Sequence, residues 1–190
     1  MIQSDVQLNA KGLACPMPII KTKKAMQQLA EGQVLEVQAT DKGSVADLAA
    51  WCKAVGHQYI GSREENGVLF HYVRKCNPET SDKLEKTFEY TISPEEAVKA
   101  SGLILDVREA AEFAFGHIPG AKSIPLGELA DRLDELPKEE PVYVICRTGT
   151  RSDLAAKQLA TAGFKYVRNV LPGMNAYNGE LKKEFQCEKR

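Results

Sequence analysis

In the first part of the chain, segments with the hydrophobic periodicity of a strand alternate with segments that have the periodicity of a helix. Runs of strand character occur at VQLNA and VLEVQA, and QYIGSREENGVLFHYVR predicts a hairpin that turns at Asn66-Gly67. Helical spacing predicts one helix opening at Pro16 and ending by Gly32, and another over VADLAAWCKAV, capped by Ser44 and ended by Gly56. The order strand, helix, strand, helix, strand, strand predicts a two-layer α/β sandwich with both helices on one face of a four-stranded sheet.

The later part of the chain has a different pattern. LILDV and VYVIC are short apolar runs without alternation, as expected for parallel strands that are covered on both faces. SPEEAVKA predicts a helix with Ser93 as its cap and Glu96 completing a capping box. SDLAAKQLATAG predicts a helix that stops at Gly163, and YVRNV another strand. We therefore expect an α/β domain with helices on both faces of a parallel sheet.

Between these two patterns the chain is polar. The stretch KCNPETSDKLEKT, residues 75–87, contains few large apolar residues and has the composition of a linker. We predict a first domain over residues 1–75, a linker over residues 76–87 and a second domain over residues 88–190.

Composition and charge narrow the class of protein. Of the 190 residues, 43% are hydrophobic and 27% charged, and the net charge is −1, so nucleic acid or an anionic membrane surface is not an expected partner. No apolar run reaches the length of a membrane span, and the N-terminus lacks a signal-peptide core. We expect a cytoplasmic protein whose thiols stay reduced. The five cysteines form no CxxC pair, so each is either packing or single-cysteine chemistry.

The first candidate site is the loop that follows VYVIC. Cys146 ends a predicted strand, a helix follows at once, and free N–H groups at a helix start favour an anion. The loop residues after the cysteine are Arg147, Thr148, Gly149, Thr150 and Arg151. The glycine permits a sharp turn and the arginines add positive charge, so we expect a thiolate nucleophile rather than a buried structural cysteine.

The spacing within this loop bears on the chemistry. Four residues separate Cys146 from Arg151, one fewer than in the loop of cysteine phosphatases. A smaller ring suits a sulfane sulfur held on the cysteine as a persulfide better than a full phosphate. A small phosphatase or arsenate reductase is the alternative that this spacing disfavours.

The second candidate site is GLACPMPIIKTKKAM. Cys15 is expected at the cap of a helix that Pro16 and Pro18 stiffen. The helix dipole and three lysines further along are expected to activate the thiol moderately; they are Lys21, Lys23 and Lys24. The residues alone leave open whether Cys15 is a presented thiol or a small structural cap.

Two resemblances decide between these interpretations. The second domain resembles the rhodanese sulfurtransferases: LILDVREAAEFAFGHIPGAKSIP is similar to their first signature, and CRTGTR has the form CRxGxR. The resemblance implies that Cys146 bears the transferred sulfur and that residues 147–151 form its cradle, with Arg147 and Arg151 contacting the anion. We interpret four residues of the signature as scaffold: Asp106, Arg108, Glu109 and His117.

The first domain resembles the TusA sulfur carriers, which carry a CPxP motif. LNAKGLACPMPIIKTKKAM and VLEVQATDKGSVADLAAWCKAVGH bear the resemblance, which implies a persulfide carried on Cys15. Asp41 matches an acidic position of that family without an assigned role. We expect Cys52 to be packing, and Cys76 and Cys187 to be exposed, incidental thiols.

Together these features predict a two-domain sulfurtransferase. Cys146 takes sulfur from thiosulfate, a polysulfide or a low-molecular-weight persulfide, and Cys15 relays it to an acceptor. The expected partners are this small-molecule donor and a protein that gives or accepts persulfide, and no metal or organic cofactor is implied. A non-catalytic relay between a desulfurase and a biosynthetic acceptor is the main alternative, and the sequence leaves the oligomeric state open.

Overall fold

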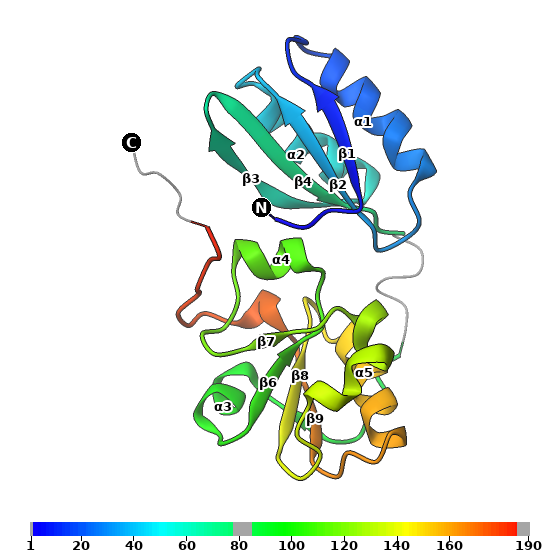
Figure 1. The fold of residues 1–190 in the computed structure, drawn as a ribbon, viewed down its shortest axis with the longest axis vertical. Coiled ribbons are helices and arrows are strands. Elements are labelled where there is room, and N and C mark those ends of the chain that lie inside the picture. The colour runs from blue at the N-terminus through cyan, green and yellow to red at the C-terminus, as the bar shows by residue number, and fades with distance from the viewer. Residues whose placement is uncertain (1, 78–84, 186–190) are drawn as a thin grey trace. The chain divides into compact units, whose positions relative to one another are not determined.

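The computed structural model describes residues 2–77 and 85–185, which form two compact units (Figure 1). Residues 2–77 build the first unit and residues 85–184 the second. Most of the predicted linker, and Cys187 near the C-terminus, lie outside the described residues. The predicted domain boundaries therefore stay a prediction, and each unit is described by itself.

The first unit has the predicted order of elements. They are β1 (Val6–Ala10), α1 (Met17–Gln28), β2 (Val34–Ala39), α2 (Ser44–Val55), β3 (Gln58–Glu65) and β4 (Val68–Arg74). The strands lie in the order β1-β2-β4-β3, with β1 parallel to β2 and the other pairs antiparallel. Asn66 and Gly67 both have positive φ, so the predicted turn between β3 and β4 is confirmed.

One core cluster holds the two layers of this unit together. Leu35 and Val37 of β2 share it with Met26 of α1 and with Leu48 and Cys52 of α2. Because alternate residues of a strand point to opposite faces, both helices cover the same face of the sheet. The predicted two-layer sandwich, and the packing role of Cys52, are confirmed.

The starts of the two helices differ from the prediction. Helix α1 begins at Met17, and the Met17 N–H donates to the Ala14 carbonyl at 3.0 Å, so Cys15 lies in a turn before the cap rather than at it. Ser44 is the first residue of α2 and does not cap it. Its hydroxyl instead donates to the Asp41 carbonyl at 2.5 Å. The first helix ends at Gln28, before the expected stop.

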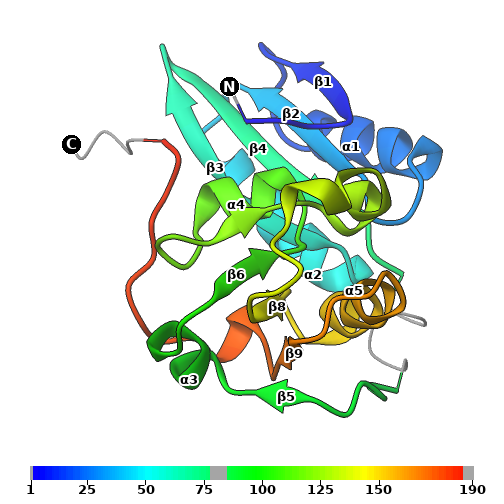
Figure 2. The ribbon, with the colours of Figure 1, turned by 60° about the horizontal axis from the view of Figure 1, so that its bottom comes forward.

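The second unit alternates strands with helices (Figure 2). Its elements are β5 (Thr91–Ile92), α3 (Pro94–Lys99), β6 (Leu103–Asp106), α4 (Ala110–Phe115), β7 (Lys122–Ser123), the 3-10 segment η1 (Leu126–Glu135), β8 (Val142–Ile145), α5 (Thr150–Thr161), β9 (Val167–Val170) and η2 (Met174–Ala176). The strands pair in parallel in the order β5-β9-β8-β6-β7. The capping box that Ser93 and Glu96 form at α3 is as predicted.

Both faces of this parallel sheet are covered. Val142 and Val144 of β8 pack in one cluster with Ala155 of α5, whereas Tyr143 and Ile145 pack in another with α3. Successive residues of one strand thus enter two cores, which explains why VYVIC shows no polar alternation. Helix α5 begins at Thr150, two residues before the predicted start, because its first turn carries polar side chains that the apolar pattern does not register.

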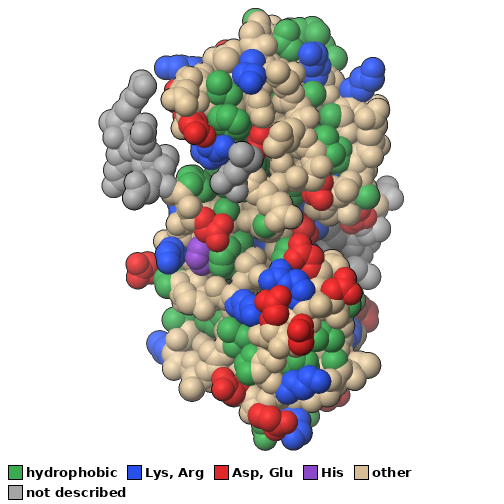
Figure 3. Space-filling view, viewed as in Figure 1, with side chains coloured by type: hydrophobic (Ala, Val, Ile, Leu, Met, Phe, Trp, Pro, Cys, Tyr) green, Lys and Arg blue, Asp and Glu red, His purple; other side chains and the backbone are tan. Residues whose placement is uncertain are grey.

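Charged side chains are mixed on the surface. On the face that Figure 3 shows, lysine and arginine are interspersed with aspartate and glutamate, in keeping with the net charge of −1. Among the helices of residues 2–77 and 85–185, none has both the length and the apolar character that crossing a membrane requires.

We predict that a cut between residues 77 and 85 yields two soluble pieces that each unfold cooperatively, because each unit has its own apolar core. Chemical denaturation of each purified piece, followed by circular dichroism, measures this. A control cut between Asn66 and Gly67 parts β3 from β4 and is expected to unfold the first unit. Loss of cooperative unfolding from both pieces of the first cut would show that the boundary is misplaced.

Candidate active site

Cys146 is the first residue after β8 and lies at the carboxyl end of the parallel sheet. Its side chain is buried, and its Sγ accepts a hydrogen bond from the Gly149 N–H at 3.1 Å. Helix α5 begins directly after Gly149, so the loop closes around the sulfur at a helix N-terminus. This arrangement of strand, loop and helix was predicted from the sequence. The positive end of the helix dipole of α5 stabilises a negative charge on the sulfur.

Only glycine fits at position 149. Its φ is +93°, a conformation that residues with a Cβ rarely adopt. A Cβ there would also lie 2.1 Å from Cδ2 of Leu171, well inside van der Waals contact. The turn that aims the Gly149 N–H at the sulfur therefore depends on the missing side chain.

A second loop, which follows β9, clamps the start of the cysteine loop. The Met174 N–H donates to the Cys146 carbonyl at 2.8 Å, and the Asn175 N–H donates to the Arg147 carbonyl at 3.1 Å. A Cβ at Gly173 would lie 2.5 Å from the Cys146 carbonyl oxygen, so the close approach again requires glycine. These contacts fix the backbone from which Sγ projects.

Two further residues contact the sulfur or its loop, and the sequence analysis missed both. The Ser152 Oγ lies 3.3 Å from Cys146 Sγ and 2.6 Å from Oδ1 of Asn169. The Asn169 amide N–H donates to the Gly149 carbonyl at 3.2 Å. A hydroxyl has a single proton, so Ser152 accepts from a thiol while it donates to Asn169, and turns its proton to the sulfur when the sulfur is an anion. A buried asparagine within the apolar run YVRNV was the available signal.

The two arginines of the loop have different partners. The Arg151 guanidinium makes a bidentate ion pair with the buried Glu112 carboxylate, at 2.7 and 3.0 Å, and lies 3.6 Å from Glu109. Burial lowers the pKa of Arg151, but the Glu112 carboxylate outweighs it and holds the pKa above its usual value. Both terminal nitrogens of Arg151 are thus engaged by the protein, which the sequence did not reveal.

Arg147 is only half-buried. Among the residues that the structure describes, no hydrogen bond or ion pair engages its guanidinium. Of the two arginines expected to contact an anion, Arg147 is therefore the one whose charge is available to a small molecule. Thr148 and Thr150 complete the loop between them.

The residues that we interpreted as scaffold are engaged within the second unit. Asp106 and Arg108 form a buried ion pair at 2.6 Å, and the same guanidinium donates to the Gly116 carbonyl. The His117 ring nitrogen Nδ1 lies 2.8 Å from the Phe113 carbonyl oxygen, and the two rings stack with centroids 3.7 Å apart. Glu109 caps α4 together with Glu112. These contacts fix the segment that carries the partner of Arg151.

Cys15 lies in a different environment. It is exposed, in the turn between β1 and α1. The Asp47 carboxylate, together with desolvation and the charge of Asp41, raises the pKa of the Cys15 thiol above its usual value. The expected activation of this thiol by the lysines of α1 is therefore wrong, because the carboxylates of Asp47 and Asp41 raise its pKa.

Two further cysteines, Cys52 and Cys76, lie within the described residues. Burial raises the pKa of Cys52 to about 12. Cys76 is buried, not exposed as expected, and its sulfur accepts from the Arg74 guanidinium at 3.3 Å. Its burial follows from the backbone pairing of Lys75 with Gln33, which continues past the end of β4. Within the described part of the chain, no group of three or more potential ligands that could hold a metal ion is found.

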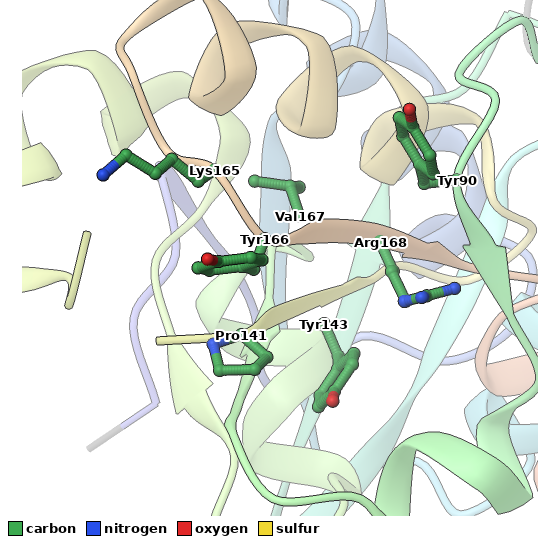
Figure 4. A pocket seen from close by; sticks show the side chains of 7 residues that line it. All are labelled: Tyr90, Pro141, Tyr143, Lys165, Tyr166, Val167 and Arg168. Atoms are coloured by element: carbon green, nitrogen blue, oxygen red, sulfur yellow. The ribbon is translucent and has the colours of Figure 1, made fainter. Parts of the chain in front are cut away.

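A cavity of about 360 Å³ lies in the second unit, away from Cys146 (Figure 4). Its lining includes Pro141 and Tyr143 from the start of β8, whereas Cys146 follows the end of that strand. Tyr90 and Tyr166 approach it from neighbouring segments. The cavity is therefore at the amino end of β8, whereas the cysteine loop is at the carboxyl end of this strand.

Comparisons with known proteins give a family match for each of the two units. The family model described as sulfurtransferase TusA matches residues 6–75, and that of the rhodanese-like domain matches residues 93–180. YrkF of Bacillus subtilis, whose name assigns it provisionally to the sulfur carrier proteins, is 44% identical over 187 residues, 95% of this chain and 99% of its own length. The sulfur carrier protein TusA of Allochromatium vinosum is 45% identical over 75 residues, 40% of this chain and 97% of its own.

A rhodanese-like domain protein of Staphylococcus aureus, known from a crystal structure, is 33% identical and covers 50% of this chain and 97% of its own, with a TM-score of 0.47. The two family models divide the chain between them, and the YrkF match spans nearly all of it. The chain thus belongs to the sulfur carrier and sulfurtransferase family in which a TusA domain is followed by a rhodanese-like domain.

Proposed function

We propose that this sulfurtransferase takes sulfane sulfur on Cys146 as a persulfide and passes it through Cys15 to an acceptor. Thiosulfate, a polysulfide or a low-molecular-weight persulfide is the donor. The observation that carries the proposal is the position of Cys146 Sγ, which accepts from the Gly149 N–H and lies within reach of the Ser152 hydroxyl. Hydrogen-bond donors in these positions stabilise a negative charge on sulfur, and they make a buried thiol a nucleophile.

The first half-reaction follows from this geometry. The Cys146 thiolate attacks the outer sulfur of thiosulfate, a new S–S bond forms, and the bond to the sulfonate sulfur breaks. Sulfite leaves with the electron pair, and the enzyme retains an anionic persulfide. The Gly149 N–H and the Ser152 O–H stabilise the charge on the cysteine, and the Arg147 guanidinium attracts the doubly charged donor.

The ion pair of Arg151 disfavours the phosphatase alternative. A cysteine phosphatase needs the guanidinium of its loop to grip the phosphate oxygens in a bidentate manner. Here the Glu112 carboxylate occupies both terminal nitrogens of Arg151. The loop is also one residue shorter than a phosphatase loop. A sulfane sulfur, which adds a single atom to the thiol, needs no such grip.

Cys15 suits the second half of the relay. Its exposure lets a partner protein reach the sulfur, and a thiol with a raised pKa is not readily consumed by other electrophiles. Other proteins of this family bear the name of sulfur carriers. We accordingly propose a protein that accepts or donates persulfide as the macromolecular partner of this domain.

We predict that Cys146→Ser lowers the turnover of thiosulfate with cyanide by about 10³-fold or more, because a hydroxyl cannot hold the persulfide. Thiocyanate formation measures turnover, and the intact mass of the donor-treated chain measures bound sulfur. Cys76→Ser serves as the matched control and is expected to retain turnover. Undiminished turnover in Cys146→Ser would refute the mechanism, whereas no turnover in the wild type would favour a non-catalytic relay.

We also predict that Arg151→Ala acts mainly on stability, since it leaves the buried Glu112 carboxylate without its ion-pair partner. Breaking such a buried pair costs about 3–5 kcal/mol of the free energy of unfolding. The double variant Arg151→Met/Glu112→Gln is expected to recover most of the loss and to retain turnover, which urea denaturation and the thiocyanate assay measure. If the double variant is stable but inactive, Arg151 contacts the substrate directly.

A further inference from the structure

Asn169 is a polar side chain in an apolar layer of the second unit. Alternate residues of a strand share one face of the sheet, so the Asn169 side chain lies on the same face of β9 as Val167. Val167 packs there in the core cluster that contains Ala155 and Leu159 of α5. Asn169 is completely buried, and its backbone pairs with β8 on one side and with β5 on the other. Burying an amide costs free energy unless its polar atoms are hydrogen-bonded, so the partners of this side chain indicate why it stands there.

Both ends of this amide are engaged, each by a residue that contacts the sulfur of Cys146. Oδ1 of Asn169 accepts a hydrogen bond from Ser152 Oγ at 2.6 Å, and Nδ2 donates to the Gly149 carbonyl at 3.2 Å. Ser152 Oγ lies 3.3 Å from Cys146 Sγ, and the Gly149 N–H donates to the same atom at 3.1 Å. One side chain of β9 therefore connects the two groups that contact the sulfur.

The contact with Asn169 determines where the Ser152 hydroxyl points. Ser152 is in the first turn of α5, and a serine in that setting readily bonds a carbonyl of the preceding residues. The Gly149 carbonyl is such an acceptor, but the Asp153 N–H and Asn169 Nδ2 already occupy it, at 3.0 and 3.2 Å. Oδ1 of the same asparagine holds the hydroxyl, so Ser152 Oγ stays within reach of the sulfur.

An asparagine has the functional groups that this arrangement needs. Its amide carries an acceptor and a donor on one short side chain, so it engages a hydroxyl and a carbonyl at once. Leucine has a similar volume without a polar atom. An ionised aspartate has only acceptors and would turn a carboxylate oxygen toward the Gly149 carbonyl, which repels it.

We propose that Asn169 is a positioning residue for sulfur transfer, which holds the Ser152 hydroxyl beside Cys146 Sγ for the steps in which this sulfur carries negative charge. The proposal rests on the proposed function of Cys146 as the sulfur-bearing nucleophile. The amide bonds Ser152 and Gly149 rather than the sulfur, so it acts on the reaction through them. A hydroxyl that is already in place stabilises the charge without first having to find its position.

The hydroxyl rotates between two acceptors and keeps its proton throughout. While Cys146 is a thiolate, the O–H points to Sγ. The thiolate attacks the outer sulfur of thiosulfate, the new S–S bond forms, and sulfite leaves with the electron pair of the broken bond. Sγ is then the uncharged inner atom of the persulfide, and the O–H turns back to Oδ1 of Asn169. When an acceptor takes the outer sulfur, Sγ keeps the electron pair of the S–S bond and the O–H turns to it again.

Two other roles for Asn169 predict different behaviour. An asparagine that only fills space would, on replacement by leucine, alter the free energy of unfolding and leave the pH dependence of sulfur uptake unchanged. An asparagine that only competes with the sulfur for the Ser152 proton would, on the same replacement, make uptake faster. A positioning role predicts slower uptake and a shift of its pH dependence to higher pH, because the charge on sulfur loses a donor.

The test uses the full chain with Cys15→Ser, so that sulfur taken up from thiosulfate is not relayed. Asn169→Leu, Ser152→Ala and the double variant are compared with this parent, and Asn178→Leu is the matched control because Asn178 is exposed. Mass spectrometry follows sulfur on the tryptic peptide of residues 139–147 between pH 6 and 10. Urea denaturation measures the stability of each chain.

We expect Asn169→Leu and Ser152→Ala each to slow uptake at pH 7 by about tenfold, the effect of one hydrogen bond to a charged group, and to raise the pH of the half-maximal rate. The double variant is expected to be close to the slower single variant, because both substitutions remove the same hydroxyl contact. Asn178→Leu is expected to match the parent. If Asn169→Leu does not fold, Asn169→Ala, which is smaller than the residue it replaces, is measured against the same expectations.

Three results would overturn the role of Asn169. They are an unchanged pH dependence with altered stability, uptake that becomes faster, and a double variant whose loss is the product of the two single losses. No sulfur on the peptide of the parent would contradict the proposed function of Cys146, and the role of Asn169 would fall with it.

Discussion

The structure of the cysteine loop depends on the hydrogen bond from the Gly149 N–H to Cys146 Sγ. This hydrogen bond exists because a glycine at positive φ turns the chain between β8 and α5, where Leu171 leaves no room for a Cβ. The loop after β9 fixes the other side of the same turn through the Cys146 carbonyl. Strand, helix and both loops therefore set the position of the sulfur before any donor arrives.

The two thiols are placed in opposite electrostatic surroundings. Cys146 is buried, lies next to the N-terminus of α5 and accepts a hydrogen bond from a backbone N–H. Cys15 is exposed, and the carboxylates of Asp47 and Asp41 raise the pKa of its thiol. Groups that stabilise negative charge suit Cys146 both for attack on a donor and for departure as a leaving group, whereas exposure lets Cys15 meet an acceptor protein. This contrast is consistent with transfer of sulfur from Cys146 to Cys15.

Local patterns were sufficient to predict the order of strands and helices in the first unit, the longer elements of the second unit and the place of Cys146, whereas the short elements β5, α4 and β7 and the 3-10 segments were not predicted. Apolar runs such as VYVIC and turns such as Asn66-Gly67 carry that information within a few residues. The partners of the site residues could not be predicted in this way. Glu112 meets Arg151 across 39 residues of sequence, and Asn169 meets Ser152 across 17. The effect of Asp41 and Asp47 on the pKa of Cys15 could not be predicted for the same reason, because both carboxylates come from a later segment of the chain.

The central claim is that sulfur taken up by Cys146 reaches Cys15. The most direct measurement loads the full chain with thiosulfate, for the wild type and for Cys146→Ser, and maps added sulfur on the peptide of residues 12–21 by mass spectrometry. Sulfur on Cys15 in the wild type and none in the variant is the result that the account predicts. Equal sulfur on Cys15 in both chains would contradict it, since Cys15 would then take sulfur without Cys146.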